Sequence, residues 1–384
     1  MPPVGRSAVS PRVLVDATAV PADRGGVGRY VDGLVAALDA AGADLALVCQ
    51  RSDYERYGRM APHANVVPGP AAIAHRPARL AWEQTGLPLV AHQVGAQVIH
   101  SPHYTMPLRT SQPVCVTIHD VTFFTEAEMH TAVKGTFFRS AMRTAVRKSK
   151  RIIVPSKATR DELIRVLEGD STATDVAYHG VDTSTFHPPT EEDKRRVRLR
   201  LGLADSRYVA FLGMLEPRKN VPNLIRGWAE AVHGRPDAPA LVLAGGSGWD
   251  DDVDAAVASV PSHLKVIRPG YLRFSDLPGY LGGALLVAYP SHGEGFGLPV
   301  LEAMACGAPV LTTPRLSLPE VGGDAVAYTQ PDIDSIAHEM RALVDDAQRR
   351  GALAQAGLTR AREFTWAASA EAHLASYARA AADS

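Results

Sequence analysis

The chain has 384 residues, of which 46% are hydrophobic and 21% are charged, and its formal net charge at pH 7 is −1. These values are typical of a soluble globular protein of two domains, and they give no electrostatic argument for a nucleic-acid partner. The tail over residues 1–10 lacks the apolar core of a signal peptide, and no apolar run is long enough to span a bilayer, so we expect a cytoplasmic protein. Each cysteine lies in or beside an apolar run, which favours reduced core thiols over a disulfide or metal set: Cys49, Cys115 and Cys306.

The first predicted strand, residues 12–18, leads into a glycine-rich loop and then into a helix, an order typical of α/β domains. A dinucleotide-binding loop would need G-x-G-x-x-G and an acidic residue after the second strand. The chain instead has G-G-x-G-R-Y, and its second strand, residues 44–49, is followed by Gln-Arg. We therefore discount a dinucleotide-binding loop, and a structural tight turn remains one interpretation of Gly25, Gly26 and Gly28.

Polar residues follow two further short strands. His103 and Tyr104 lie just beyond a strand that ends at Ile99, and His119 and Asp120 directly follow an apolar run of strand length. Ligands bind at the carboxyl ends of strands in open α/β sheets, so these side chains are candidates for a site. For Asp120, an Asx turn that ends the strand is the structural alternative.

The next segment, residues 138–151, combines six basic residues with apolar ones. A solvated helix face is the ordinary interpretation of such a pattern. Peripheral contact of residues 139–151 with an anionic membrane surface is the sharper one. By contrast, the prolines scattered through residues 51–90 predict no particular order of elements.

The second half of the chain begins after the proline pair at 188–189 and a charged run, which together fit a domain boundary. A strand over residues 208–213 leads to Arg218 and Lys219, which lie in a strand-to-helix loop. Adjacent cations there would neutralise a diphosphate, the arginine by bidentate bonding and the lysine as a point charge. A surface charge pair is the alternative. Another strand ends in glycines that include Gly246.

Asp250 and Asp252 form a D-x-D pair whose hard oxygen ligands would suit a divalent metal ion. The same run also has the composition of an acidic helix start, which the helix dipole stabilises. Because Arg218 and Lys219 already supply positive charge, we expect the aspartates to be structural. We accordingly expect neither a metal nor a cofactor.

The most informative stretch follows the apolar run 284–290. A glycine-rich loop with Glu294 at its centre precedes a helix that starts near Pro299, and Glu302 lies in that helix. Free backbone N–H groups and the helix dipole at such a start suit a phosphate. Carboxylates accept hydrogen bonds from hydroxyls, so the two glutamates around an anion site suit a nucleotide sugar. The structural alternative is a solvated loop glutamate and a first-turn glutamate that answers the dipole.

From Glu294 to Val310 the chain reads E-G-F-G-L-P-x-L-E-A-M-A-x-G-x-P-V, which resembles the donor-site signature of retaining glycosyltransferases of family four. This resemblance implies the α/β fold called GT-B, in which two Rossmann-like domains face each other across a cleft. The N-terminal, acceptor-side domain would comprise residues 1–186, completed by a last helix within 366–384 that crosses back to it. The nucleotide-sugar-binding domain would comprise residues 187–365.

The resemblance also implies site residues. The catalytic group would comprise His119, Arg218, Lys219 and Glu294. The acceptor-side group would comprise His103, Tyr104 and Asp120. The donor-binding group would comprise Gly25, Gly26, Gly28, Gly246, Tyr271, Leu272, Gly295, Phe296, Gly297, Leu298 and Glu302.

The segments around His103 and His119 resemble bacterial mannosyltransferases of this family. The implied reaction moves a hexose, first of all mannose from GDP-mannose, to a glycan or lipid-linked acceptor, with retention and without metal. Two alternatives remain: a nucleotide-sugar epimerase of the same fold, and a non-catalytic subunit that binds nucleotide sugars. Full retention of His119, Arg218, Lys219, Glu294 and Glu302 argues against the second.

Overall fold

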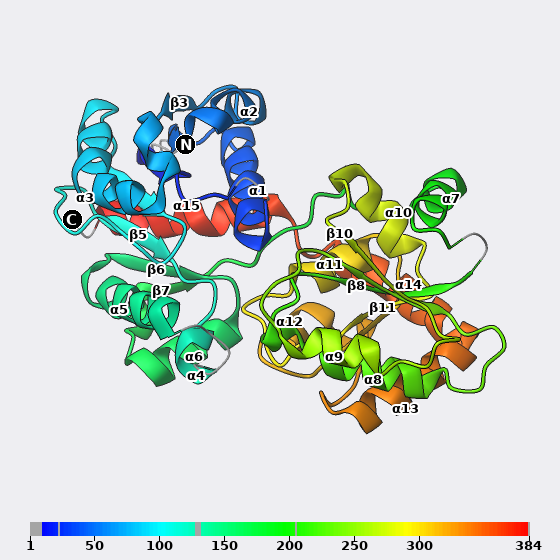
Figure 1. The fold of residues 1–384 in the computed structure, drawn as a ribbon. Coiled ribbons are helices and arrows are strands. Elements are labelled where there is room, and N and C mark those ends of the chain that lie inside the picture. Colours follow the sequence, from blue (N-terminus) through cyan, green and yellow to red (C-terminus); the bar gives the residue numbers. More distant parts are fainter. Residues whose placement is uncertain (1–9, 22–23, 127–131, 204–205, 383–384) are drawn as a thin grey trace, which may run out of the picture. The chain divides into compact units, whose positions relative to one another are not determined.

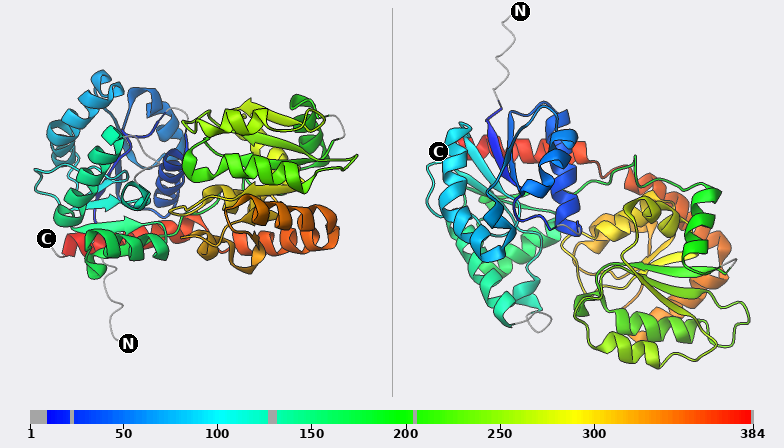
Figure 2. Two further views of the ribbon diagram at one scale, coloured as in Figure 1. Left: turned by 60° about the horizontal axis from the view of Figure 1, so that its bottom comes forward. Right: turned by 45° about the horizontal axis from the view of Figure 1, so that its top comes forward.

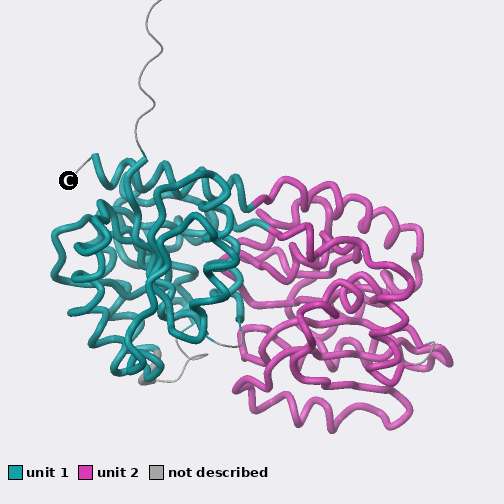
Figure 3. Tube along the Cα trace, turned by 90° about the horizontal axis from the view of Figure 1, so that it is seen from above, with its two compact units in different colours: residues 1–180, 366–384 teal, residues 181–365 magenta. Residues whose placement is uncertain are grey.

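The computed structural model describes residues 10–21, 24–126, 132–203 and 206–382. The chain forms two compact units (Figure 3), of which unit 1 comprises residues 1–180 and 366–384 and unit 2 comprises residues 181–365. The division falls slightly before the boundary expected after Phe186, because the segment that starts at Val181 packs with unit 2. There the Val181 amide donates to the Phe364 carbonyl, and the Phe186 ring packs edge-on against Phe274.

Unit 1 is built on a parallel sheet of seven strands in the order β3-β2-β1-β4-β5-β6-β7. The strands are β1 (Val13–Asp16), β2 (Leu45–Cys49), β3 (Asn65–Pro68), β4 (Val98–Ser101), β5 (Val114–Thr117), β6 (Arg151–Val154) and β7 (Thr174–Val176). The helices are α1 (Gly26–Ala40), α2 (Tyr54–Met60), α3 (Arg76–Gln93), α4 (Thr122–Thr125), α5 (Ala132–Lys148), α6 (Lys157–Leu167) and α15 (Trp366–Ala382).

Both faces of this sheet are covered by helices, as Figures 1 and 2 show, so its strands are apolar on both sides. Along β1, Val13 and Val15 pack in the core that includes α1 and α15, whereas Leu14 packs in the core that includes α3 and α5. The last helix, α15, docks closely on α1. A Cβ atom added to Gly33 of α1 would fall 2.2 Å from the Trp366 ring, so this contact requires glycine.

Unit 2 is built on a parallel sheet of six strands in the order β10-β9-β8-β11-β12-β13. The strands are β8 (Tyr208–Leu212), β9 (Ala240–Ala244), β10 (Val266–Gly270), β11 (Leu286–Tyr289), β12 (Val310–Thr312) and β13 (Ala327–Tyr328). The helices are α7 (Glu191–Arg200), α8 (Val221–Ala231), α9 (Asp252–Ala258), α10 (Leu277–Gly282), α11 (Leu298–Ala305), α12 (Leu318–Gly322), α13 (Ile333–Asp345) and α14 (Ala347–Ala361).

In each sheet the strand order reverses once, between β1 and β4 in unit 1 and between β8 and β11 in unit 2. Open parallel sheets bind ligands beyond the carboxyl ends of the strands at this reversal. The loop after β8 carries Arg218 and Lys219, and the loop after β11 carries Glu294. The topology therefore brings the adjacent cations Arg218 and Lys219 to Glu294, which lies far from them in the sequence.

Two expectations from the sequence are corrected by the structure. The helix α1 begins at Gly26, so Gly26 and Gly28 belong to its first turn and only Gly25, the N-cap residue, lies outside it. The basic helix ends at Lys148, and Arg151 lies in β6, where it is buried and paired with Asp175 at 2.7 Å. Arg151 therefore cannot contribute to a basic surface. No helix in the described ranges is long and apolar enough to cross a membrane.

Candidate active site

The loop between β11 and α11 ends in a left-handed glycine. Gly297 has φ = +100° and caps α11, and Pro299 occupies the first turn of the helix, as its sequence predicts. A side chain at position 297 would be strained by this backbone conformation, which glycine adopts readily. The result is a tight entry that points the first N–H groups of α11 toward the end of the sheet.

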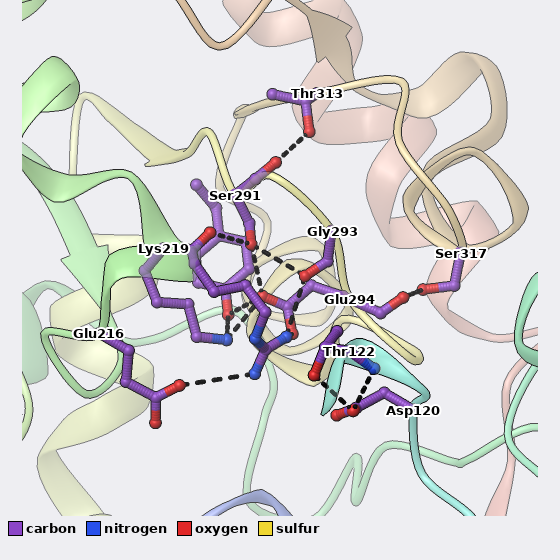
Figure 4. A network of polar contacts seen from close by, with 11 residues as sticks. Asp120, Thr122, Glu216, Lys219, Ser291, Gly293, Glu294, Thr313 and Ser317 are labelled. Atoms are coloured by element: carbon purple, nitrogen blue, oxygen red, sulfur yellow. Dashed lines mark hydrogen bonds and ion pairs between the residues drawn. The ribbon is translucent and has the colours of Figure 1, made fainter. Parts of the chain in front are cut away.

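Glu294 is the centre of a buried network in this loop (Figure 4). Its Oε2 accepts a hydrogen bond from Nη1 of Arg218 at 2.6 Å, and its Oε1 accepts one from Nζ of Lys219 at 2.6 Å. Oε1 also accepts from the hydroxyl groups of Tyr289 at 3.0 Å and Ser291 at 2.8 Å. Three of these contacts converge on Oε1, whereas Oε2 accepts from Arg218 and keeps room for a further donor.

Charge within the network keeps Glu294 ionised although it is buried. Burial would raise the pKa of this carboxyl group, but the Arg218 guanidinium and the Lys219 ammonium outweigh burial and lower it to about 2. Burial lowers the pKa of Lys219, and the neighbouring Arg218 lowers it further, while Glu294 acts in the opposite direction. A second carboxylate, that of Glu216, lies 3.6 Å from Nη2 of Arg218 (Figure 4), so the two cations of the cluster are balanced by two carboxylates.

Several further bonds fix the loop around Glu294. Ser317 donates to the carbonyl of Glu294 at 2.7 Å, and Thr313 donates to the carbonyl of Ser291 at 2.5 Å (Figure 4). The amide of His292 donates to the carbonyl of Arg218, which ties the loop after β11 to the loop after β8. The cluster is therefore preorganised by the fold.

Arg218, Lys219 and Glu294 lie in one cluster, because the loops that carry them follow two neighbouring strands, β8 and β11. Arg218 and Lys219 lie in a 3-10 turn, Pro217–Lys219, and both side chains point to Glu294. The sequence analysis did not identify Tyr289 and Ser291 as site residues. Tyr289 is the last residue of an apolar strand, and its hydroxyl at the carboxyl end of that strand was the available signal.

The other donor-site candidates of unit 2 lie on nearby elements. Phe296 and Leu298 are almost fully buried at the entry to α11, and Glu302 is buried inside this helix. Tyr271 is 60% exposed beyond β10, and its hydroxyl oxygen lies 2.6 Å from where a Cβ atom at Gly246 would be. Glycine at position 246 is therefore required for Tyr271 to lie across this loop. Leu272, next to Tyr271, is partly buried.

In unit 1, His119 lies among aromatic rings just after β5. Its Nε2 donates to the carbonyl of Pro102 at 2.8 Å, and its ring meets the ring of Tyr30 edge-on at 5.0 Å. The ring of His103 lies 6.1 Å away and that of Tyr104 5.7 Å away. Burial lowers the pKa of His119, so its imidazole is neutral at pH 7.

Asp120 makes the turn that was its structural alternative. Its Oδ1 accepts hydrogen bonds from the amide and the hydroxyl of Thr122, at 3.1 and 2.7 Å.

The glycine segment, Gly25 to Gly28, lies at the other side of the strand reversal. A Cβ atom added to Gly25 or Gly26 would have no neighbour within 4 Å, whereas one at Gly28 would press on the Arg24 side chain at 3.2 Å.

The aspartates that could form a metal site start a helix instead. The amide of Asp252 donates to Oδ1 of Asp250, and Asp252 lies in the first turn of α9, where the helix dipole favours its charge. Within the described residues, no group of three or more histidine, cysteine, aspartate or glutamate side chains is placed to hold a metal ion.

Comparison with known families covers both units. Residues 24–185 match the family model described as Glycosyltransferase Family 4, and residues 193–360 match the model described as Glycosyl transferases group 1. O-antigen chain mannosyltransferase B of Escherichia coli is 34% identical over 272 residues, which cover 70% of this chain and 71% of that protein.

Two other relatives match over shorter stretches. The D-inositol 3-phosphate glycosyltransferase of Kineococcus radiotolerans is 33% identical over 62% of this chain and 59% of that protein. The GDP-mannose-dependent monoacylated alpha-(1-6)-phosphatidylinositol monomannoside mannosyltransferase of Corynebacterium glutamicum is 31% identical over 49% of this chain and 51% of that protein.

Solved structures share the fold at low sequence identity. Sucrose-phosphate synthase from Thermosynechococcus elongatus has a TM-score of 0.77 at 20% identity, over 97% of this chain and 99% of that chain. Anabaena HepE in complex with UDP and glucose has a TM-score of 0.74 at 18% identity, over 94% and 97% of the two chains. Both sheets and both family models agree, and the chain therefore belongs to the family-four glycosyltransferases of GT-B fold, with likeness to their bacterial mannosyltransferases.

Proposed function

We propose that the protein transfers mannose from GDP-mannose to a glycan or lipid-linked acceptor with retention of the anomeric configuration. The observation that carries this proposal is the cluster at the strand reversal of unit 2 in which Glu294 holds the cations of Arg218 and Lys219. Such a cluster beside a helix N-terminus has the cations and the N–H donors to receive a nucleotide diphosphate. The relatives compared above are named as glycosyltransferases, and none supports an epimerase.

Departure of the diphosphate is the step that these residues would assist. As the bond between the anomeric carbon and the phosphate oxygen breaks, negative charge grows on the leaving group. Arg218, Lys219 and the first N–H groups of α11 would stabilise this charge without a metal ion. Lys219 uses two of its three ammonium protons on Tyr289 and Glu294, so one remains for a phosphate oxygen.

Glu294 has a different part in this proposal from the one its sequence motif implies. Its Oε1 is surrounded by Lys219, Tyr289 and Ser291, whereas its Oε2 accepts from Arg218. Glu294 thus holds the two cations in place, and its Oε2 would accept a further hydrogen bond from a donor-sugar hydroxyl. Glu302 would bind the ribose, and Gly246, Tyr271 and Leu272 would border the base.

Unit 1 would complete the reaction. Its glycine segment, Gly25 to Gly28, would approach the diphosphate, and His119 would contact the donor sugar. His103, Tyr104 and Asp120 would face the acceptor. No nucleophilic side chain is assigned, because the acceptor hydroxyl would attack the face that the leaving phosphate vacates, with that phosphate accepting its proton.

The acceptor would be a glycan or a lipid-linked glycan. The Escherichia coli relative is named for an O-antigen chain, and the Corynebacterium relative for an acylated phosphatidylinositol mannoside. Exposed side chains of α5, among them Phe137, Arg143, Arg147 and Lys148, would suit peripheral contact with an anionic membrane. Co-sedimentation with phosphatidylglycerol vesicles, absent with phosphatidylcholine vesicles, would support this contact.

A panel of nucleotide sugars tests the donor. The protein is incubated with GDP-mannose, GDP-fucose, UDP-glucose, UDP-galactose and UDP-N-acetylglucosamine, and release of free nucleotide is measured with and without mannoside acceptors. We expect release from GDP-mannose that increases with acceptor. Release from a UDP-sugar alone would keep the reaction class and overturn the donor, and release from none would overturn the function.

A further inference from the structure

A chain of hydrogen bonds between five buried side chains runs through the core of unit 1, directly behind His119. The hydroxyl of Tyr377 meets Nδ1 of His100 at 2.8 Å, and Nε2 of His100 meets the Thr117 hydroxyl at 2.8 Å. The Thr117 hydroxyl meets that of Tyr30 at 2.8 Å, and the latter meets Nε2 of His373 at 2.9 Å. We call these five residues the histidine–tyrosine chain. They come from α1, β4, β5 and α15, and none is more than 1% exposed.

The direction of every bond in this chain follows from its last contact. Nδ1 of His373 lies 2.7 Å from the carbonyl oxygen of Ser369, which can only accept, so Nδ1 carries the proton. Nε2 of neutral His373 must then accept from Tyr30. The single Tyr30 proton is thereby used, so Thr117 donates to Tyr30. His100 in turn donates its Nε2 proton to Thr117 and accepts at Nδ1 from Tyr377.

This assignment requires both histidines to be neutral, and their surroundings ensure it. Burial lowers the pKa of His100 well below its ordinary value, and the neighbouring His373 and His119 lower it further. Burial also lowers the pKa of His373 to about 4, although the Ser369 carbonyl and Asp175 act in the opposite direction. A proton on His373 would turn its Nε2 into a donor and reverse its bond with Tyr30.

The chain reaches His119 through the ring of Tyr30. That ring packs edge-on against His119 at 5.0 Å and lies 4.6 Å from His179, while its hydroxyl is held between Thr117 and His373. Thr117 also ends the strand that leads to His119. The Pro102 carbonyl fixes the proton of His119 on Nε2. Its Nδ1 is therefore left as a hydrogen-bond acceptor.

We propose that the histidine–tyrosine chain is a positioning device, which holds Tyr30 so that His119 presents Nδ1 in one orientation as an acceptor for a sugar hydroxyl. The proposal rests on the function proposed above for His119. Because His373 and Tyr377 belong to α15, this helix helps to position His119, although the two lie far apart in the sequence. A fully satisfied polar chain specifies one arrangement of its members, whereas apolar side chains of similar volume fill a core without fixing a ring by its hydroxyl.

The first test needs no substrate. In the wild-type protein at pH 7, nitrogen-15 NMR of labelled histidines should find His100 and His119 protonated at Nε2 and His373 protonated at Nδ1. Each tautomer has a distinct pair of nitrogen shifts. Finding His119 protonated at Nδ1, or His373 protonated at Nε2, would overturn the proposal even in an active enzyme.

The second test removes one hydroxyl and keeps the ring. Tyr30→Phe breaks the chain at its centre, and Tyr57→Phe is a matched control. Tyr57 is fully buried in the same core, and its hydroxyl has no hydrogen-bond partner among the described residues. For Tyr30→Phe we expect kcat to fall by about tenfold or more, with the KM for GDP-mannose changed less than about twofold. Tyr57→Phe should retain wild-type values.

Variants of His373 separate positioning from general destabilisation. The Oε1 atom of His373→Gln replaces Nε2 as the acceptor for Tyr30, whereas His373→Leu removes the acceptor. Transfer activity should survive in the first variant and fall in the second as it does in Tyr30→Phe. Equal kcat for Tyr30→Phe and Tyr57→Phe would overturn the proposal. If the wild-type protein acts on no nucleotide sugar, the proposed function fails, and the NMR result shows whether the chain itself exists as assigned.

Discussion

At the scale of single residues, the site of unit 2 depends on how charge is balanced around Glu294. The buried Glu294 carboxylate holds the buried ammonium of Lys219 and the partly buried guanidinium of Arg218. Glu216 lies beside Arg218 as a second carboxylate, and a buried charge without a partner would be costly. The sequence motif located Glu294, Arg218 and Lys219, because glycine-flanked glutamate and adjacent cations at strand ends are distinctive patterns. It could not reveal that they bind one another, since that contact depends on the pairing of β8 with β11.

Glu294→Gln should affect both stability and turnover. An amide keeps the shape but loses the charge, and its NH2 group would face a donor, so Lys219 would lose its charged partner and Arg218 would keep only Glu216. We expect the free energy of unfolding to fall by about 3 kcal/mol, and turnover to fall by at least about a hundredfold. Urea titration and a transfer assay measure the two effects.

A surface pair offers the control for this variant. Glu192 pairs with Arg195 on the surface of unit 2, where both side chains are well exposed, and Glu192→Gln should change stability by less than about 1 kcal/mol and leave turnover unchanged. Added GDP should restore part of the lost stability of Glu294→Gln, because its phosphates replace the missing negative charge. Near-native turnover in Glu294→Gln would remove this residue from the site.

At the scale of elements, helix starts and strand ends carry the candidate residues. Most strands follow from apolar runs, and the start of α11 follows from Pro299. At the start of α6, Ser156 caps the helix and accepts from the Thr159 amide. The start of α1 was mispredicted because glycines usually indicate a loop, yet here the first turn tolerates them. The prolines of residues 51–90 concealed α3, which contains Pro88. Its stability comes from packing in the core, where Leu87 and Ala91 are fully buried.

The first turn of α1 allows a clean test of close ligand approach. A side chain at Gly26 meets nothing within 4 Å, so Gly26→Val should fold normally. We expect GDP binding, measured by calorimetric titration, to persist because unit 2 provides it, whereas transfer should be nearly abolished. Gly58→Val, in another helix of unit 1 with equally open space, is the control. Loss of both binding and transfer in Gly26→Val would place this turn in the primary nucleotide site, and loss of neither would make it an ordinary turn.

The docking of α15 predicts a pH dependence of stability. The folded state holds His373 neutral, with a pKa of about 4, whereas the unfolded chain protonates it near its ordinary value of 6.5. Between these values the unfolded state binds more protons, so stability falls as the pH falls below about 6.5. From pH 7 to pH 5 this residue alone should lower the free energy of unfolding by about 2 kcal/mol.

Urea unfolding at several pH values measures this effect, and His373→Gln supplies the comparison. The variant should lose stability less steeply over this range, because glutamine does not titrate. A wild-type curve that is flat between pH 7 and pH 5 would show that His373 is not held neutral in the core.

At the scale of the whole molecule, two parallel-sheet units divide the work that the function requires. The candidate groups for the diphosphate lie in unit 2, and those for the donor sugar and the acceptor lie largely in unit 1. The sequence signature was dense in the second half and sparse in the first, so the fold and the phosphate site were more predictable than the histidine–tyrosine chain. That chain joins residues from position 30 to position 377, a juxtaposition that only the folded sheet produces.

Removal of divalent metal tests whether side chains suffice for the leaving group. If Arg218, Lys219 and the start of α11 supply the positive charge, transfer should continue at a similar rate in excess EDTA. Loss of activity on chelation, with recovery on addition of Mn²⁺, would instead assign a role to Asp250 and Asp252. Asp250→Asn is then the variant that should abolish the recovery.

The central claim is that this chain moves a sugar from a nucleotide diphosphate to an acceptor hydroxyl with retention. Proton NMR of the reaction mixture, with GDP-mannose and a methyl α-mannoside acceptor, tests it most directly. The account predicts a disaccharide with a new α-linkage, formed in step with free GDP and not formed by Glu294→Gln. A β-linked product, or free mannose or its epimer in place of a glycoside, would contradict it.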